Sequence, residues 1–156
     1  MTESATTPRG ECWFCGERPA EDSPPGGWLL EDDLWRAGHT PASYAPAGTV
    51  VLELRRHALD QAEFTPAELH TLGPVTGRLV TAIRAATGAD RVYHWATMAA
   101  HPHFHLWLLP WWSGADATGP DYLLRATSGG GCSPEQAEAT AGALRTALET
   151  CRPGAR

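Results

Sequence analysis

The sequence predicts an α+β domain, in which an antiparallel sheet of about five strands carries one main helix and a C-terminal helix. Polar and apolar side chains alternate from residue 101 to residue 110, as on a strand with one buried face. Apolar residues recur every three or four positions after Phe64, and a second helix start stands at Ser133. With 156 residues, the chain fits one domain, expected over residues 12–156 after a loose tail over residues 1–11.

Composition restricts the class of function. The formal net charge is −6 and all twelve basic residues are arginine, which argues against a general nucleic-acid partner because such binding needs a basic stripe. No apolar run is long enough to cross a bilayer, and residues 1–10 lack the hydrophobic region of a signal peptide. We therefore expect a cytoplasmic protein with no membrane partner.

A pair of cysteines near the N-terminus predicts a metal site. Cys12 and Cys15 are separated by two residues and followed by Gly16, a spacing that lets two thiolates converge on one metal ion. A redox pair is the alternative, but it would normally open a helix after a strand, whereas a Pro/Gly-rich loop follows here. Zinc is therefore favoured, and its two further ligands must come from the histidines.

Three strands are expected before the main helix. Residues 28–36 form a short apolar segment, an acidic turn and a second apolar segment, as in a hairpin. A third strand over residues 49–54 is followed directly by Arg55, Arg56 and His57. This places basic and imidazole side chains at the end of a strand.

The helices are marked by their caps. Thr65 and Glu68 form a capping box around Pro66, and Gly88 supplies the C-cap. The apolar face of this main helix has five residues: Leu69, Leu72, Val75, Leu79 and Ile83. The Gly73–Pro74 pair should kink the helix or break it in two, because proline removes a hydrogen bond.

Beyond the main helix, one more strand and a terminal helix are predicted. A strand over residues 91–97 leads through a turn into the alternating run. The capping pattern from Ser133 predicts a helix from about residue 134 to about residue 150. Cys132 and Cys151 fall near its two ends, too far apart to pair, and we interpret both as incidental thiols.

The alternating run holds the candidate chemistry. From His101 to Pro110 it reads His-Pro-His-Phe-His-Leu-Trp-Leu-Leu-Pro. On a strand, His103, His105 and Trp107 share one face, and His101 joins them if the strand begins that early. Imidazole is a nucleophile, a general base and a metal ligand at neutral pH, so this face predicts a reactive surface.

The run resembles the signature of the histidine-triad (HIT) family of nucleotide hydrolases and transferases, His-φ-His-φ-His-φ-φ with φ apolar. Two registers fit. If the Leu-Leu-Pro ending anchors the match, His103 is the first triad position, His105 the middle one and Trp107 the third. If the run is matched instead to the His-Pro-His-x-Gln of galactose-1-phosphate uridylyltransferases, His103 is the middle residue and His105 the third. We favour the first register, because the run then also resembles small bacterial members.

The resemblance implies an enzyme acting at the α-phosphate of a nucleoside phosphate, phosphoramidate or dinucleotide. His105 would be the nucleophile that forms a phospho-histidine intermediate, with His103 beside it. Trp107, Arg56 and His101 are expected to contact the substrate, and a homodimer is implied. As in zinc-bearing members, a structural zinc would have four ligands: Cys12, Cys15, His57 and His103, or His101 in place of His103 in the second register.

Trp107 keeps two other functions open. Tryptophan offers one N–H donor and no acid at the third triad position. The preceding segment, Met98 to Ala100, also lacks the glycine or asparagine residues that family members often carry there. The alternatives are a zinc-stabilised nucleotide-binding protein without turnover and a zinc-dependent hydrolase that uses metal-bound water.

Overall fold

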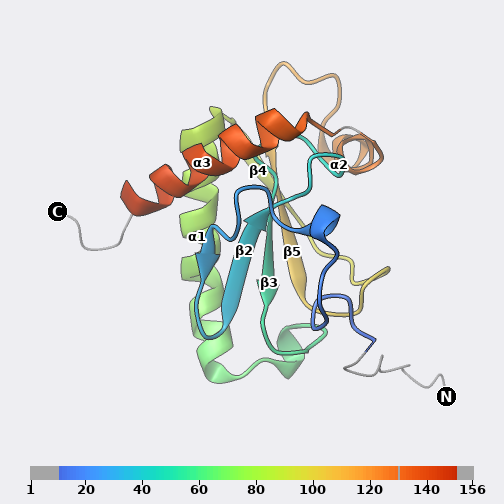
Figure 1. Cartoon of the computed structure of the whole chain (residues 1–156), viewed down its shortest axis with the longest axis vertical. Helices are drawn as coiled ribbons and strands as arrows, with labels where there is room; N and C mark the ends of the chain where they lie inside the picture. The colour runs from blue at the N-terminus through green and yellow to red at the C-terminus, as the bar shows by residue number, and fades with distance from the viewer. Residues whose placement is uncertain (1–10, 130, 151–156) are drawn as a thin grey trace.

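The computed structural model describes residues 11–129 and 131–150, which form one antiparallel sheet with helices on both faces (Figure 1). Most of the tail predicted over residues 1–11 lies outside the described residues, as does Cys151. None of the described helices combines the length and the apolar character that crossing a bilayer requires.

The sheet has five strands in the order β1-β2-β3-β5-β4, and every neighbouring pair is antiparallel. The strands are β1 Leu30–Glu31, β2 Trp35–His39, β3 Val50–Leu54, β4 Arg91–Trp95 and β5 His105–Trp111. The side chain of Asp32 accepts hydrogen bonds from the amides of Leu34 and Trp35, which closes the acidic turn of the hairpin. This arrangement confirms the predicted α+β class.

The main helix α1, Pro66–Thr87, begins and ends where its caps predict. Thr65 and Glu68 form the reciprocal capping box, and Gly88 adopts the left-handed conformation with φ 67°. The predicted break is wrong, because the helix continues through Pro74 as one element. Pro74 lies on the exposed side of α1, where water can satisfy the carbonyl that loses its partner.

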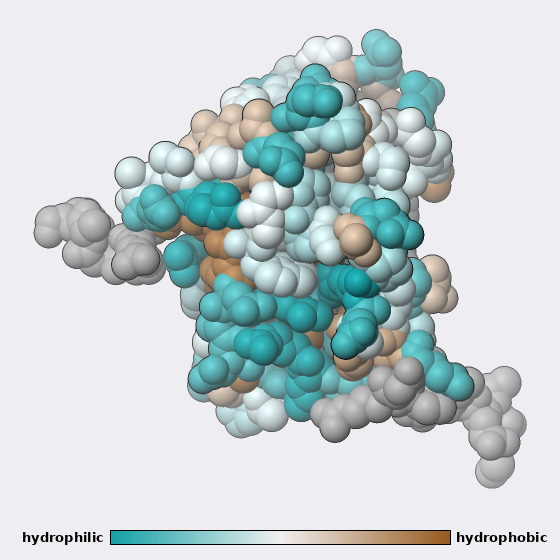
Figure 2. Space-filling model, viewed as in Figure 1, coloured by the Kyte–Doolittle hydropathy of each residue, from teal (hydrophilic) through white to brown (hydrophobic). Residues whose placement is uncertain are grey.

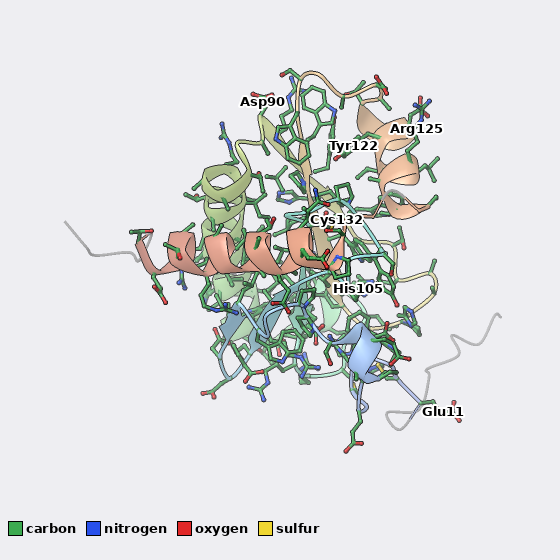
Figure 3. The ribbon with its side chains drawn as sticks, turned by 45° about the horizontal axis from the view of Figure 1, so that its top comes forward. Glu11, Asp90, His105, Tyr122, Arg125 and Cys132 are labelled. Carbon is green, nitrogen blue, oxygen red and sulfur yellow. The ribbon has the colours of Figure 1, made fainter. Side chains whose placement is uncertain are left out.

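Two further helices cover the sheet. The helix α3, Pro134–Thr150, crosses α1 and packs against it (Figure 1). The shorter α2, Gly119–Thr127, packs on the other face, where the hydroxyl of Tyr122 donates to the carbonyl of Pro110 at 2.5 Å (Figure 3). Short 3₁₀ turns occur at Ala20–Asp22 and Gln61–Glu63.

The alternation along β3 and β5 separates the core from the candidate site. Leu52 and Leu108 are fully buried in the main core, which α1 and α3 complete. Glu53, His105 and Trp107 point to the opposite face, where Glu53 is the direct cross-strand partner of His105. On the face shown in Figure 2, hydrophilic residues predominate, and apolar surface gathers mainly beside α3 where it crosses α1.

An ion pair at the start of α1 predicts how stability depends on pH. Arg56 donates to Glu68 at 2.8 and 3.0 Å, and these bonds lower the pKa of Glu68 from 4.5 to about 2. The stability that they contribute is present above about pH 4.5 and is lost as the pH falls towards about 2. Because the side chain of Arg56 is 39% exposed, we expect the ion pair to stabilise the fold by about 1–2 kcal/mol. This is less than the free energy that corresponds to the whole pKa shift.

Urea unfolding of the wild type and of Glu68→Gln between pH 6 and pH 2.5 measures this contribution. The wild type should be the more stable protein at pH 6, and the difference should narrow below about pH 4.5. Glu138→Gln, at an exposed site on α3, is the matched control and should show no such narrowing. If the difference in unfolding free energy between the wild type and Glu68→Gln stays constant over the whole pH range, the Arg56–Glu68 ion pair is not its source.

Candidate functional site

Two cysteines and two histidines from distant parts of the chain meet beside the sheet. Their ligand atoms all lie within 4.8 Å of one another, and the four residues are Cys12, Cys15, His57 and His103. His103 Nδ1 lies 3.4 Å from the sulfur of Cys12 and 3.5 Å from that of Cys15, and His57 Nδ1 lies 3.6 Å from the sulfur of Cys15. The structure therefore assembles a Cys₂His₂ cluster from residues up to 91 positions apart.

Local structure explains why these four side chains converge. The carbonyl of Cys12 accepts hydrogen bonds from the amides of Cys15 and Gly16 at 3.1 and 3.0 Å, and this tight turn brings both sulfurs to one side. His57 follows the end of β3, and His103 precedes β5, the strand paired with β3. Adjacent strands thus bring the two histidines together.

The donor set and its surroundings fit a zinc ion. His103 is fully buried, and its Nε2–H donates to the carbonyl of Leu54 at 2.6 Å, which leaves Nδ1 facing the two sulfurs. Histidine ligands of zinc characteristically donate their other ring nitrogen to such a carbonyl. Burial lowers the pKa of His103 to about 4, so the imidazole is neutral at neutral pH, as a metal ligand must be.

The histidine-rich strand begins later than the alternation suggests. β5 starts at His105, so His101 and His103 both precede it. Pro102 has no amide hydrogen, and the amide of Phe104 donates to the carbonyl of Ala58 at 2.7 Å. The chain therefore leaves the sheet before His105 and follows the segment after β3, which carries His103 to the metal cluster.

The two registers differ in which histidine is the first triad position, and the structure separates these residues. His103 belongs to the cluster, whereas His101 lies outside it, with its ring tilted against Trp13 at 5.4 Å. This placement favours the register in which His105 is the middle residue and Trp107 the third.

His105 has the surroundings of a nucleophile. Its Nδ1–H donates to the carbonyl of His103 at 2.7 Å, which leaves Nε2 available to a substrate. Only 7% of the residue is exposed, and this burial lowers the pKa of the imidazole, so the ring is neutral at pH 7. Phe14 stacks on the ring at 4.5 Å and further limits its rotation. A neutral, oriented imidazole can attack an electrophilic phosphorus atom.

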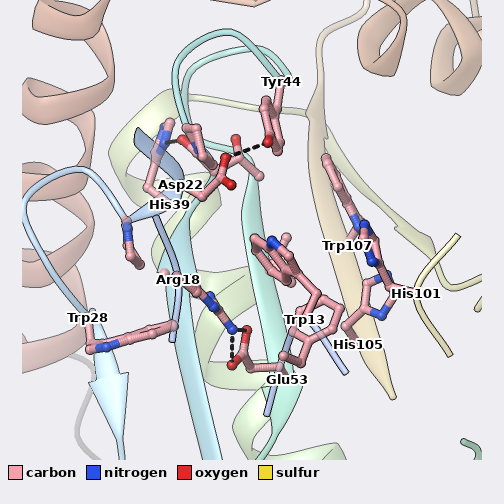
Figure 4. Close-up of a pocket in the computed structure, with 16 residues that line it drawn as sticks. Trp13, Arg18, Asp22, Trp28, His39, Tyr44, Glu53, His101, His105 and Trp107 are labelled. Carbon is pink, nitrogen blue, oxygen red and sulfur yellow. Dashed lines mark hydrogen bonds and ion pairs between the residues drawn. The ribbon is translucent and has the colours of Figure 1, made fainter. Parts of the chain in front are cut away.

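A pocket opens beside His105 (Figure 4). Its cavity volume is about 130 Å³, below the roughly 300–1,000 Å³ of pockets for drug-sized ligands. The residues that matter for its chemistry are Trp13, Arg18, Glu53, His101, His105 and Trp107. A second hollow, of about 200 Å³, is also lined by His101, His105 and Trp107. Trp95 and Thr97 contribute further aromatic and polar side chains to its wall. His105 therefore borders two hollows.

Several residues of this pocket were missed by the sequence analysis. Trp13 and Phe14 were considered only as spacers between the two cysteines, yet both rings pack on the histidine segment. Arg18 and Arg36 both bind Glu53 on the pocket floor. The available signal was a lone glutamate in an otherwise apolar strand, because a buried carboxylate requires a cationic partner.

Arg56, predicted to contact the substrate, lies elsewhere. Besides its ion pair with Glu68, it donates to the carbonyls of Glu63 and His57 at 2.9 and 3.3 Å. Those bonds anchor the start of α1 and occupy the guanidinium donors of Arg56, so we assign Arg56 a structural role. Of the three predicted substrate contacts, His101 and Trp107 line the pocket.

Comparisons identify the fold. A histidine triad protein from Bradyrhizobium japonicum matches with a TM-score of 0.69 and 19% identity, over 88% of this chain and 98% of that chain. A hypothetical histidine triad nucleotide-binding protein from Sulfolobus tokodaii has a TM-score of 0.61 and 18% identity, over 79% and 83% of the chains. A zinc-bound histidine triad family protein from Mycobacterium smegmatis has a TM-score of 0.57 and 19% identity, over 79% and 84%.

At the level of sequence, no family model and no curated protein matches. The structural matches show that the chain has the histidine-triad-like fold that its histidine run predicts. On this fold it carries a Cys₂His₂ cluster next to a histidine-lined pocket.

Proposed function

We propose that the protein is a nucleotide hydrolase or nucleotidyltransferase that acts at an α-phosphate through a phospho-histidine on His105. The observation that carries this proposal is the orientation of His105, whose ring is held through Nδ1 with Nε2 left for the substrate. Its place on the histidine-triad-like fold supports it, as does the structural similarity to the hypothetical histidine triad nucleotide-binding protein from Sulfolobus tokodaii.

In the proposed reaction, the lone pair of His105 Nε2 attacks the α-phosphorus, and the bond to the leaving group breaks with its electron pair. Water or another acceptor then attacks the phospho-histidine and releases the imidazole. The hydrogen bond to the carbonyl of His103 stabilises the ring as it becomes positively charged. Trp107 and Arg18 line the same pocket as His105, so we propose the Nε1–H of Trp107 and the guanidinium of Arg18 as donors to a phosphate oxygen.

We propose a structural zinc as the occupant of the Cys₂His₂ cluster. Four protein donors complete a tetrahedral site and leave no position for a reacting water molecule, which argues against the zinc-hydrolase alternative. When bound, zinc would cross-link the segment of Cys12 and Cys15 to the sheet. This segment carries Trp13 and Phe14, so the ion would hold both rings against the histidines.

The test is intact-protein mass spectrometry after brief, quenched incubation with nucleoside phosphoramidates, dinucleoside polyphosphates and nucleotide sugars. We expect a mass increase of one nucleotidyl group, and fragmentation should locate it on His105. If no donor gives an adduct or a product while the protein is folded and contains zinc, the hydrolase or transferase proposal fails.

A second function, nucleotide binding without turnover, is favoured by one observation. Trp107, the third triad position in the register we favour, lines the pocket beside His105, where it adds a stacking surface and no acid. Tight nucleotide binding with neither adduct nor product would establish this function instead. Homodimerisation and a cytoplasmic location stay predictions.

A further inference from the structure

A buried charge cluster stands next to His105. The carboxylate of Glu53 is 1% exposed and contacts two guanidinium groups, those of Arg18 and Arg36. Arg18 Nη2 lies 2.5 Å from both carboxylate oxygens, and Arg36 binds one of them through Nε. These two cations and one anion carry a net charge of +1 one cross-strand position away from His105, and the other carboxylate that lines the pocket, Asp22, accepts a hydrogen bond from the hydroxyl of Tyr44.

The two arginines differ in the hydrogen-bond donors that they have left for a ligand. Arg36 also donates through Nη2 to the carbonyl of Phe14 at 2.9 Å, so it serves to hold the segment that covers His105. Arg18 binds Glu53 through Nη2 alone; its Nε–H is buried out of reach, and its Nη1 makes no hydrogen bond to the described residues. Arg18 is therefore the cation with donors to spare.

Aromatic rings hold the Arg18 guanidinium in place. Its central carbon lies 4.5 Å from the ring centre of Trp13 and 5.0 Å from that of Trp28 (Figure 4). The ring of Phe14 packs against both Arg18 and His105. Its centre lies 5.3 Å from the central guanidinium carbon of Arg18 and 4.5 Å from the ring centre of His105. A guanidinium fixed in this way is a preorganised anion receptor, because little side-chain entropy remains to be lost on binding.

Trp107 cannot assist a strongly basic leaving group, and His101, an imidazole that lines both hollows, packs against Trp13. An amine or an alkoxide is strongly basic and must gain a proton as it departs, and the indole of Trp107 has no proton of suitable acidity. A phosphate is weakly basic and departs as an anion, so it requires a nearby cation and no acid. Arg18 supplies such a cation in the pocket that Trp107 also lines.

We infer that Arg18 forms an anion subsite for the departing phosphate of a phosphoanhydride substrate, and that it selects phosphoanhydrides over phosphoramidates. The inference rests on the proposed role of His105. His105 Nε2 attacks the α-phosphorus, and the bond to the bridging oxygen breaks. Its electron pair stays on the departing phosphate, which Arg18 binds. Water then cleaves the phosphorus–nitrogen bond, giving a nucleoside monophosphate and one proton, and the imidazole is restored.

Paired substrates test the selectivity. A dinucleoside polyphosphate and a nucleoside phosphoramidate with the same base share the transferred group and differ in the leaving group. We expect the wild type to show the higher kcat/KM with the phosphoanhydride. Arg18→Gln should lower that value roughly 10–100-fold, the effect of losing a charge-assisted hydrogen bond, and should change the phosphoramidate value less than about threefold. Equal losses with both substrates, or a wild type that prefers the phosphoramidate, would overturn the inference.

Arg125→Gln is the matched control. It makes the same change of charge on the exposed side of α2 (Figure 3) and should leave both kcat/KM values unchanged. If Arg18→Gln folds poorly because Glu53 loses a partner, the double variant Arg18→Gln/Glu53→Gln also removes the carboxylate and returns the cluster to its wild-type net charge of +1. The double variant should show the same loss that is specific to the phosphoanhydride.

Calorimetric titration with inorganic pyrophosphate tests the subsite without turnover. The wild type and Arg125→Gln should bind it, and both Arg18 variants should bind it at least about tenfold more weakly. If no donor forms an adduct but pyrophosphate binding depends on Arg18, the proposed function fails and the subsite stands. If adducts form on His105 while pyrophosphate binding is insensitive to Arg18, the subsite fails and the function stands.

Discussion

Replacing His105 by alanine is expected to lower the turnover of every accepted nucleotide donor by roughly 10⁴-fold or more, because the variant lacks the attacking atom. The fold and the metal cluster should persist. His105 lies on the pocket face, outside the main core, and it contributes no donor to the Cys₂His₂ cluster. Steady-state rates, the zinc content and the thermal midpoint, measured on the same preparation, separate loss of chemistry from loss of structure.

His94→Ala is the matched control, because His94 is an exposed histidine of β4 outside both hollows. We expect it to keep the wild-type rate. A stricter version uses His105→Gly with added imidazole, which should recover part of the activity by occupying the vacated space. If His105→Ala keeps more than about a tenth of the wild-type rate, His105 is not the nucleophile, and the phospho-histidine mechanism is wrong.

Sequence patterns that depend on only a few neighbouring residues, such as helix caps, predicted the secondary structure well. The capping box at Thr65 and the C-cap at Gly88 bound α1 as expected, because caps satisfy backbone groups within one turn. The break at Pro74 did not occur. Whether a proline interrupts a helix depends on tertiary packing, and the buried Val75 and Leu79 hold the next turns of α1 against the core.

The site was less accessible to prediction from sequence than the fold. The cysteine spacing and the histidine run pointed to the metal donors, because those residue types have few other uses in such patterns. Trp13, Arg18 and Glu53 could not be assigned to the pocket in the same way. Their roles arise from tertiary contacts, such as the Arg18–Glu53 pair, whose members are 35 residues apart, and sequence periodicity says nothing about such contacts.

The start of β5 illustrates the same limit. The alternation of side chains extends back to His101, but the strand begins at His105 because the preceding backbone bonds to the segment after β3. The periodicity still indicated the correct faces, since Phe104 joins the core while His103 does not. A period of two thus predicts on which face of the sheet a side chain lies, whereas ladder hydrogen bonds decide where the strand begins.

Removal of zinc is expected to produce the largest loss of stability. Binding of a structural zinc is worth about 10–16 kcal/mol in small zinc domains, and we expect about 5 kcal/mol or more here because the sheet retains its own core. Cys12→Ser should purify with less than one zinc per chain and show a much lower thermal midpoint. Without the ion, the segment of Trp13 and Phe14 should exchange its amide hydrogens rapidly, since the cross-link to His57 and His103 is lost.

Cys132→Ser serves as the matched control, because Cys132 lies at the start of α3, away from the cluster. This variant should keep both the zinc and the thermal midpoint. His101→Ala should likewise keep the zinc, whereas His103→Ala should lose it, because only His103 belongs to the Cys₂His₂ cluster. Zinc retained by Cys12→Ser at full stoichiometry would show that the cluster is not the metal site. Turnover lost on chelation from a protein whose fold is unchanged would mean that the ion takes part in the chemistry, and the metal-bound-water mechanism would then replace the role of His105.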